Sequence, residues 1–207
     1  MTHIASAVPC LGFAVAAVAL GLAACGTGGS PPVTYVLGTP PAAQNNVEPL
    51  VGRPVLEVKP VLLPDYLDVS DIMVRRSENM IAPSATGQWG ERLSVGATRA
   101  LTSDLQERLS GVLVTNTAPL DRPALQVIAE LETFEPQADG TVILVARWRL
   151  VNTASHRVLA SERVSLTESN SEVTDSAMAA SMSRALADLS AHIAQVVRTA
   201  LAQKRGK

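Results

Sequence analysis

Three consecutive segments between residues 124 and 166 alternate apolar and polar side chains, and this pattern constrains the fold more than any other feature of the chain. The segments cover residues 124–134, 141–151 and 157–166, and two short polar turns separate them. A period of two predicts β-strands that are apolar on one face, and turns this short join antiparallel neighbours. A sheet of this kind has to bury its apolar face against another layer.

The two faces of this sheet carry different side chains. In the third segment, four aliphatic residues are expected to point inward, with Glu162 among them as an exception: Val158, Ala160, Val164 and Leu166. On the outer face, two carboxylates of the first segment are expected beside two arginines of the second: Glu130, Glu132, Arg147 and Arg149. Paired carboxylates can serve acid–base chemistry, but next to arginines they indicate a solvated patch of cross-strand ion pairs.

Two segments with a spacing of about four residues predict the helices that cover the apolar face. From Trp89 to Leu109 an apolar residue recurs at every fourth position, which predicts a helix of about five turns. Gly111 follows in the position where a left-handed residue commonly ends a helix. A second amphipathic helix is predicted from about Thr174 to Ala202, and Thr174 supplies its N-terminal signal.

The chain before residue 124 supplies the remaining strands. In chain order, they are predicted at residues 33–37, 53–63, 72–75, 78–82 and 111–115, the third and fourth as a hairpin. Pro60 has no amide to donate, so its N-terminal side belongs at a sheet edge or a bulge. We therefore expect residues 33–207 to form one α/β domain. It is a sandwich with a mostly antiparallel or mixed sheet and two long helices on one face.

An uncharged leader precedes this domain. The first 24 residues contain no Asp, Glu, Lys or Arg, and the apolar run ends in Leu-Ala-Ala-Cys at Cys25. This pattern predicts a lipoprotein signal peptide over residues 1–24, cleaved before a lipidated Cys25, and a flexible tether over residues 25–32. An uncleaved membrane anchor and a plain secretory signal are the alternatives. The run is near the lower limit of a spanning helix, which needs about 20 residues.

The leader also predicts where the domain resides. Acyl chains on Cys25 would hold the domain at a membrane surface, facing the periplasm. Gly26 follows the cysteine, where an aspartate is the usual signal for retention at the inner membrane, so the outer membrane is favoured over the inner. Removal of the leader leaves a single cysteine and hence no intramolecular disulfide. The net charge of −2 argues against a nucleic-acid binder.

The sequence contains no recognisable catalytic motif. His156 falls in a predicted turn and His192 on the polar side of the last helix, and neither has an evident nucleophile or acid as a partner. We therefore expect a protein that is not an enzyme and uses no metal or cofactor. Trp89 and Trp148 are interpreted as core residues, whereas Tyr66 is either an exposed anchor for a partner or a packed corner residue.

The order of these features resembles the PqiC-like family of ABC-type transport auxiliary lipoproteins. After the lipobox, the motif consists of a Tyr-x-Leu edge strand, a Pro-x-Tyr-Leu corner, an arginine that ends the next strand and a tryptophan before the helix. The matching residues are Tyr35, Leu37, Pro64, Tyr66, Leu67, Arg75 and Trp89. The resemblance covers nearly all of residues 33–207 and implies that these seven positions include partner-binding residues, without separating them from residues that hold the fold.

The resemblance implies a role in moving phospholipid between the inner and outer membranes. The expected partners are an MCE-domain protein, which forms a conduit, and the components of an inner-membrane transporter, and several copies of the chain can assemble. Two other functions stay open. A lipid-binding carrier would enclose its ligand between sheet and helices, and a structural lipoprotein of envelope assembly would need no MCE-domain partner.

Overall fold

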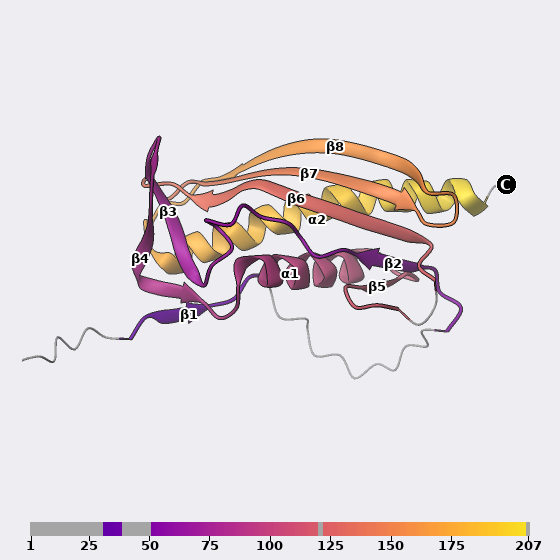
Figure 1. Ribbon diagram of the computed structural model, residues 1–207, viewed down its shortest axis with the longest axis horizontal. Helices are drawn as coiled ribbons and strands as arrows, with labels where there is room; N and C mark the ends of the chain where they lie inside the picture. Colours follow the sequence, from indigo (N-terminus) through magenta and orange to yellow (C-terminus); the bar gives the residue numbers. More distant parts are fainter. Residues whose placement is uncertain (1–30, 39–50, 120–121, 206–207) are drawn as a thin grey trace, which may run out of the picture. The chain divides into compact units, whose positions relative to one another are not determined.

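The computed structural model describes residues 31–38, 51–119 and 122–205 (Figure 1). The strands are β1 (Val33–Tyr35), β2 (Val55–Val58), β3 (Asp71–Ser77), β4 (Met80–Trp89), β5 (Leu113–Thr115), β6 (Leu125–Pro136), β7 (Val142–Asn152) and β8 (Arg157–Glu168), and the helices are α1 (Leu93–Arg108) and α2 (Asp175–Arg205). The chain divides into two units, residues 1–31 and 32–207, and all these elements belong to the second. The predicted signal peptide and Cys25 lie outside the described residues.

The larger sheet contains the three alternating segments as an antiparallel meander. Its strand order is β5-β2-β6-β7-β8, with β2 parallel to both β5 and β6. The inward positions of β6 and β7 are fully buried, as the alternation predicts. The sheet is therefore mixed, and two helices pack on it, which confirms the predicted α/β sandwich.

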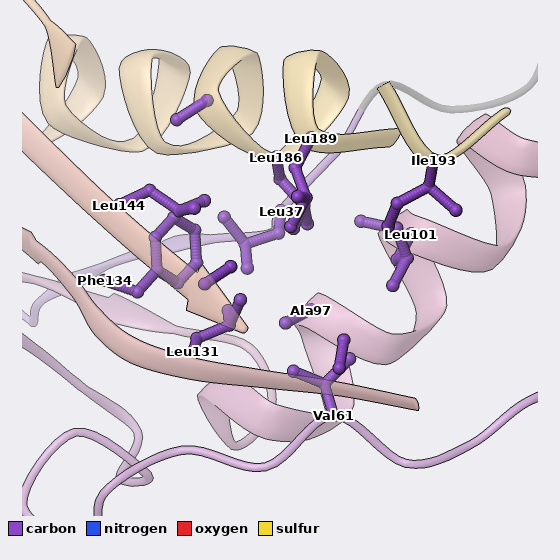
Figure 2. Packing of buried hydrophobic residues seen from close by; sticks show 14 of the residues in the cluster. Leu37, Val61, Ala97, Leu101, Leu131, Phe134, Leu144, Leu186, Leu189 and Ile193 are labelled. Atoms are coloured by element: carbon purple, nitrogen blue, oxygen red, sulfur yellow. The ribbon is translucent and has the colours of Figure 1, made fainter. Parts of the chain in front are cut away.

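The helices cover the apolar face of this sheet and form one core with it. Figure 2 shows side chains from the sheet, from α1 and from α2 meeting in this layer: Leu131, Phe134, Leu144, Ala97, Leu101, Leu186, Leu189 and Ile193. Each of them is almost completely buried. Burial of an aliphatic or aromatic side chain contributes roughly 1.5–3 kcal/mol, so this layer is the main source of stability.

A second, three-stranded sheet accompanies the larger one, whereas the sequence predicts a single sheet. The hairpin of β3 and β4 is confirmed, but β4 is ten residues long and pairs with β1 in parallel along its other edge. Trp89 ends this strand, and α1 begins only at Leu93. The prediction that the helix starts at Trp89 was wrong, because Trp89 is buried from a strand that happens to keep the spacing of four.

Two further differences arise where ladders are interrupted. β2 stops at Val58, and Lys59 and Leu62 still donate to β6 while Pro60 between them has no amide to offer. In β8, the partners of Leu150 and Val151 are Ala160 and Val158, so Leu159 is an extra residue at a bulge. The bulge changes the alternation, and Val158 is 51% exposed instead of facing inward as predicted.

The predicted start of α2 and the predicted end of α1 agree closely with the structure. The Oγ1 atom of Thr174 accepts a hydrogen bond from the amide of Ala177 at 3.2 Å, as an N-cap does. Gly111 has a φ of +78° and lies two residues beyond Leu109, the C-cap of α1. The left-handed glycine that the sequence predicts is therefore present. It lies one position beyond the residue that directly follows the C-cap, which is the usual place for such a glycine.

Candidate functional site

Tyr66 and Arg75, two residues of the Pro-x-Tyr-Leu and arginine motifs, meet at a buried carboxylate that the sequence analysis missed. Tyr66 lies in the turn that closes when the amide of Leu67 donates to the carbonyl of Pro64 at 2.9 Å. Arg75 lies on β3, and the carboxylate belongs to Glu135, the penultimate residue of β6. We call these three residues the Glu135 cluster.

Glu135 is only 1% exposed although it lies on the outer face of the larger sheet. A register shift between Leu131 and Thr133 changes the phase of β6, so that Glu135 pairs with Ile143 and points away from the helices. The small sheet covers it there, because Arg75 also forms a parallel bridge with Gln137. The cluster therefore lies where the two sheets meet.

Both oxygens of Glu135 have partners. The Nε atom of Arg75 donates to Oε1, and the hydroxyl of Tyr66 donates to Oε2 at 3.5 Å. A second nitrogen of Arg75 donates to the carbonyl of Glu78 at 3.1 Å, in the β3–β4 turn. The hydrogen bond to Glu135 raises the pKa of Arg75, and burial, followed by the nearby charge of Glu135, raises the pKa of Tyr66.

This arrangement joins the two sheets and presents one aromatic ring at the surface. Arg75 and Tyr66 together engage both oxygens of Glu135, so this carboxylate belongs to a hydrogen-bonded ion pair. The Arg75–Glu135 ion pair joins the small sheet to the larger one. Tyr66 is 43% exposed, so its hydroxyl is anchored inward while its ring remains available for contact.

The other residues of the motif have different environments. Leu37, Leu67 and Trp89 are core residues, and each is at most 4% exposed. Tyr35 and Pro64 are half-buried. Partner binding by these positions stays a prediction, and in the folded domain it concerns Tyr66, Arg75, Tyr35 and Pro64, because the three core side chains do not reach the surface.

The histidines lie away from the Glu135 cluster. The Nε2 atom of His192 lies 2.5 Å from Glu162 Oε2, and its ring packs edge-on against Trp148 with 6.1 Å between the ring centroids. His156 lies in the β7–β8 turn with a φ of +54°. Trp148 is fully buried, as predicted.

Glu130, Glu132 and Arg147 form ion pairs on the outer face, as predicted, but the second arginine in these pairs is Arg163 and not the predicted Arg149. Arg147 contacts both Glu130, at 3.8 Å, and Glu132, and Arg163 contacts Glu132 at 2.9 Å. Within the described residues, no group of three or more His, Cys, Asp or Glu side chains could hold a metal ion. The same residues include no helix that is long and apolar enough to cross a membrane.

Comparison with known proteins identifies relatives of this domain. A family model described as "ABC-type transport auxiliary lipoprotein component" matches residues 35–194. Among solved structures, the fold is similar to an uncharacterized protein, with a TM-score of 0.67 and 21% identity over 80% of this chain and 98% of that one. It is also similar to protein XCC0632 from Xanthomonas campestris, with a TM-score of 0.64 and 16% identity over 85% of this chain and 97% of that one.

At these identities, the two structural likenesses concern the fold alone. No curated protein matches the chain. The family model is therefore the comparison that bears on function, and its span runs from Tyr35 in β1 to Ala194 in α2.

Proposed function

Because the chain belongs to the family of ABC-type transport auxiliary lipoprotein components, we propose that it is the outer-membrane-anchored auxiliary subunit of an MCE-type system that moves phospholipid between membranes. In this role it performs no catalysis and binds no cofactor. Its partners are an MCE-domain protein and the inner-membrane transporter. Energy comes from an ATPase elsewhere in the system.

One observation carries this proposal. The family model covers the folded domain from its first strand to the middle of its last helix, and a lipobox cysteine precedes that domain. Cys25 is eight positions before Val33. Eight extended residues span at most about 29 Å, so an acylated Cys25 would keep the start of β1 within that distance of the bilayer surface.

Acylation of Cys25 would attach the domain to a membrane, but it would not determine which protein the domain binds. Each buried methylene contributes about 0.8 kcal/mol, so several acyl chains hold the protein stably in the membrane. Exposed groups such as the Tyr66 ring are then available to a conduit that arrives from the inner membrane. Assembly of several copies around such a conduit remains a prediction.

Affinity purification from gently solubilised envelopes tests the proposal. The lipidated protein is expected to recover an MCE-domain protein or transporter subunit in constant ratio, identified by mass spectrometry. Cys25→Ala should lose that partner because the domain no longer reaches the membrane, whereas Cys10→Ala, which changes the other cysteine, should retain it.

Two other results would replace the proposal. Stoichiometric phospholipid without a protein partner would indicate a lipid carrier. An envelope-assembly component without any transporter subunit would indicate a structural lipoprotein. Lipids and proteins from the same purification therefore have to be measured together.

A further inference from the structure

An open groove lies between the last turns of α2 and the β7–β8 end of the larger sheet. Its volume is about 810 Å³, larger than those of the two grooves beside β1, about 450 and 470 Å³. Leu125, Leu159, Val196 and Leu201 line it, together with two alanines. Leu159 remains 39% exposed there, so aliphatic surface is available to a ligand.

The strand that borders the groove has an open edge. β8 is the last strand of the larger sheet, and no described strand pairs with its outer side. Leu159 is the bulged residue, and the preceding Val158 is also exposed. Unpaired backbone groups next to exposed aliphatic side chains can accept an extended segment from another chain.

The charge of the groove lining favours an anion. Arg157 and His192 are its ionisable residues, and no carboxylate lines it. His192 is paired with Glu162, which lies on β8 outside the lining. Arg157 pairs with Asn152 through its backbone, but its side chain takes part in none of the hydrogen bonds or ion pairs found among residues 31–38, 51–119 and 122–205, so its guanidinium is available for a carboxylate.

The groove is remote from the point where the chain enters the domain. Val33 pairs with Gly87, and the neighbouring Thr86 donates to Asp175 at the start of α2, so the entry lies at the N-terminal end of this helix. Figure 1 shows α2 running from the β1 side to the opposite end of the sheet. His192 and Gln203 are 17 and 28 positions after Asp175, roughly 26 and 42 Å along the helix.

We propose that this groove binds an extended segment of a partner protein that alternates aliphatic and acidic residues. Its main chain adds to the open edge of β8, its aliphatic side chains fill the groove, and a carboxylate binds Arg157. This inference rests on the proposed function, for which it names a docking surface for the transport partner at the end of α2 opposite the entry of the chain.

The lining favours a peptide over a lipid. Seven of the thirteen lining residues are polar, among them Asn152 and Gln195, whose amides can both donate to and accept from a main chain. An acyl chain in so open and polar a groove would leave methylenes in water. An extended peptide can contact both the aliphatic and the polar lining residues, because its successive side chains point to opposite sides.

Fluorescence anisotropy with synthetic peptides of about eight residues tests the groove. The probes alternate valine or leucine with glutamate, and the control peptides carry lysine in place of glutamate. The mature protein in nanodiscs of zwitterionic lipid should bind the glutamate peptides saturably and not the lysine peptides. Hydrogen exchange should show increased protection of the amides at residues 157–162.

Two arginine variants distinguish binding at the groove from a general electrostatic attraction of the peptides to the protein. Arg157→Glu should weaken binding by about tenfold or more, because like charges at an interface are costly. Arg149→Glu alters an exposed arginine on the outer face of β7 and should change affinity by no more than about twofold. Equal losses in both variants, no saturable binding of any glutamate peptide, or complete competition by phosphatidylglycerol vesicles would overturn the proposal.

The same variants distinguish this inference from the proposed function. If Arg157→Glu still purifies with its full complement of transporter subunits, the groove is not the docking surface although the auxiliary role stands. If no transporter subunit purifies with the wild-type protein but the glutamate peptides bind at the groove, the groove is a peptide site and the proposed function is wrong.

Discussion

Glu135 joins the two sheets through its ion pair with Arg75. It is a buried carboxylate, and the partly exposed Arg75 compensates its charge. Removal of one member of a buried ion pair leaves the other without compensation, and this costs more than the pair itself contributes. The pair therefore makes a clear prediction about stability.

Arg75→Met should lower the free energy of unfolding by about 3 kcal/mol, since it leaves the charge of Glu135 buried and unpaired. The double variant Arg75→Met with Glu135→Met should recover most of that loss, because two apolar side chains of similar size need no desolvation. Urea denaturation of the four proteins in a double-mutant cycle measures this coupling.

Arg147→Met is the matched control, because it breaks ion pairs on the exposed outer face and should cost no more than about 1 kcal/mol. A loss for Arg75→Met as small as that of the control, or a double variant less stable than either single variant, would show that the buried pair is not coupled as described.

The sequence could supply two members of the Glu135 cluster but not the third. Tyr66 and Arg75 belong to a recognisable motif, whereas Glu135 is 60 positions from Arg75 in the chain. Simple alternation also fails there, because the bulge after Leu131 shifts the phase of β6. The signal that was available is that simple alternation from Leu131 places Glu135, a charged residue, on the apolar face of the strand.

Among the elements, α1 is capped at its N-terminus by the side chain of Asp68, a residue outside the helix and distant in the chain. Its N-cap, Arg92, makes no capping hydrogen bond with its side chain, and no acidic residue lies in the first turn. The carboxylate of Asp68 takes that role, accepting from the amide of Ser94 at 2.9 Å and from Arg92. Unpaired amides at a helix start favour such an anion.

Asp68→Ala should destabilise the protein by about 1 kcal/mol at neutral pH, as the loss of an N-cap does, and Asp68→Asn should cost less because its amide oxygen still accepts. Burial raises the pKa of Asp68, but the hydrogen bonds from Ser94 and Arg92 outweigh it and hold the pKa below 3.8. The charged form is thus favoured in the folded state.

The pH dependence of this contribution follows from the direction of the shift. It is present in full above the unfolded pKa of 3.8 and is lost as the pH falls through the lower folded value. The stability difference between wild type and Asp68→Asn, measured by denaturation, should therefore shrink below pH 3.8. A difference that stays constant or grows there would contradict the capping role.

The same elements show how far the sequence predicts the fold. The meander and α2 follow from periodicity, because each buries one face against a continuous core. The start of α1 cannot be predicted from periodicity, since its capping group comes from Asp68. In addition, Trp89 continues the spacing of four residues although it belongs to strand β4. The split into two sheets depends on pairing between β1 and β4, residues far apart in the chain, which no local pattern specifies.

At the scale of the whole domain, the point where the chain enters and the groove proposed to bind a peptide lie at opposite ends of α2. The entry, at Val33 beside the start of that helix, is the end that a lipidated Cys25 would hold near the membrane. The groove around Leu159 and Arg157 lies toward the other end. If the anchor holds the entry end, the proposed peptide groove lies at the end of α2 that is farther along the chain from the anchor.

The auxiliary role in transport is the central claim, and transfer of phospholipid between the membranes tests it most directly. Cells lacking this chain receive a pulse of isotope-labelled lipid precursor, and the label is followed in separated inner and outer membranes. Deletion should slow the redistribution, the wild-type gene and Cys10→Ala should restore it, and Cys25→Ala should not. Redistribution at the normal rate in the deletion strain would contradict the claim.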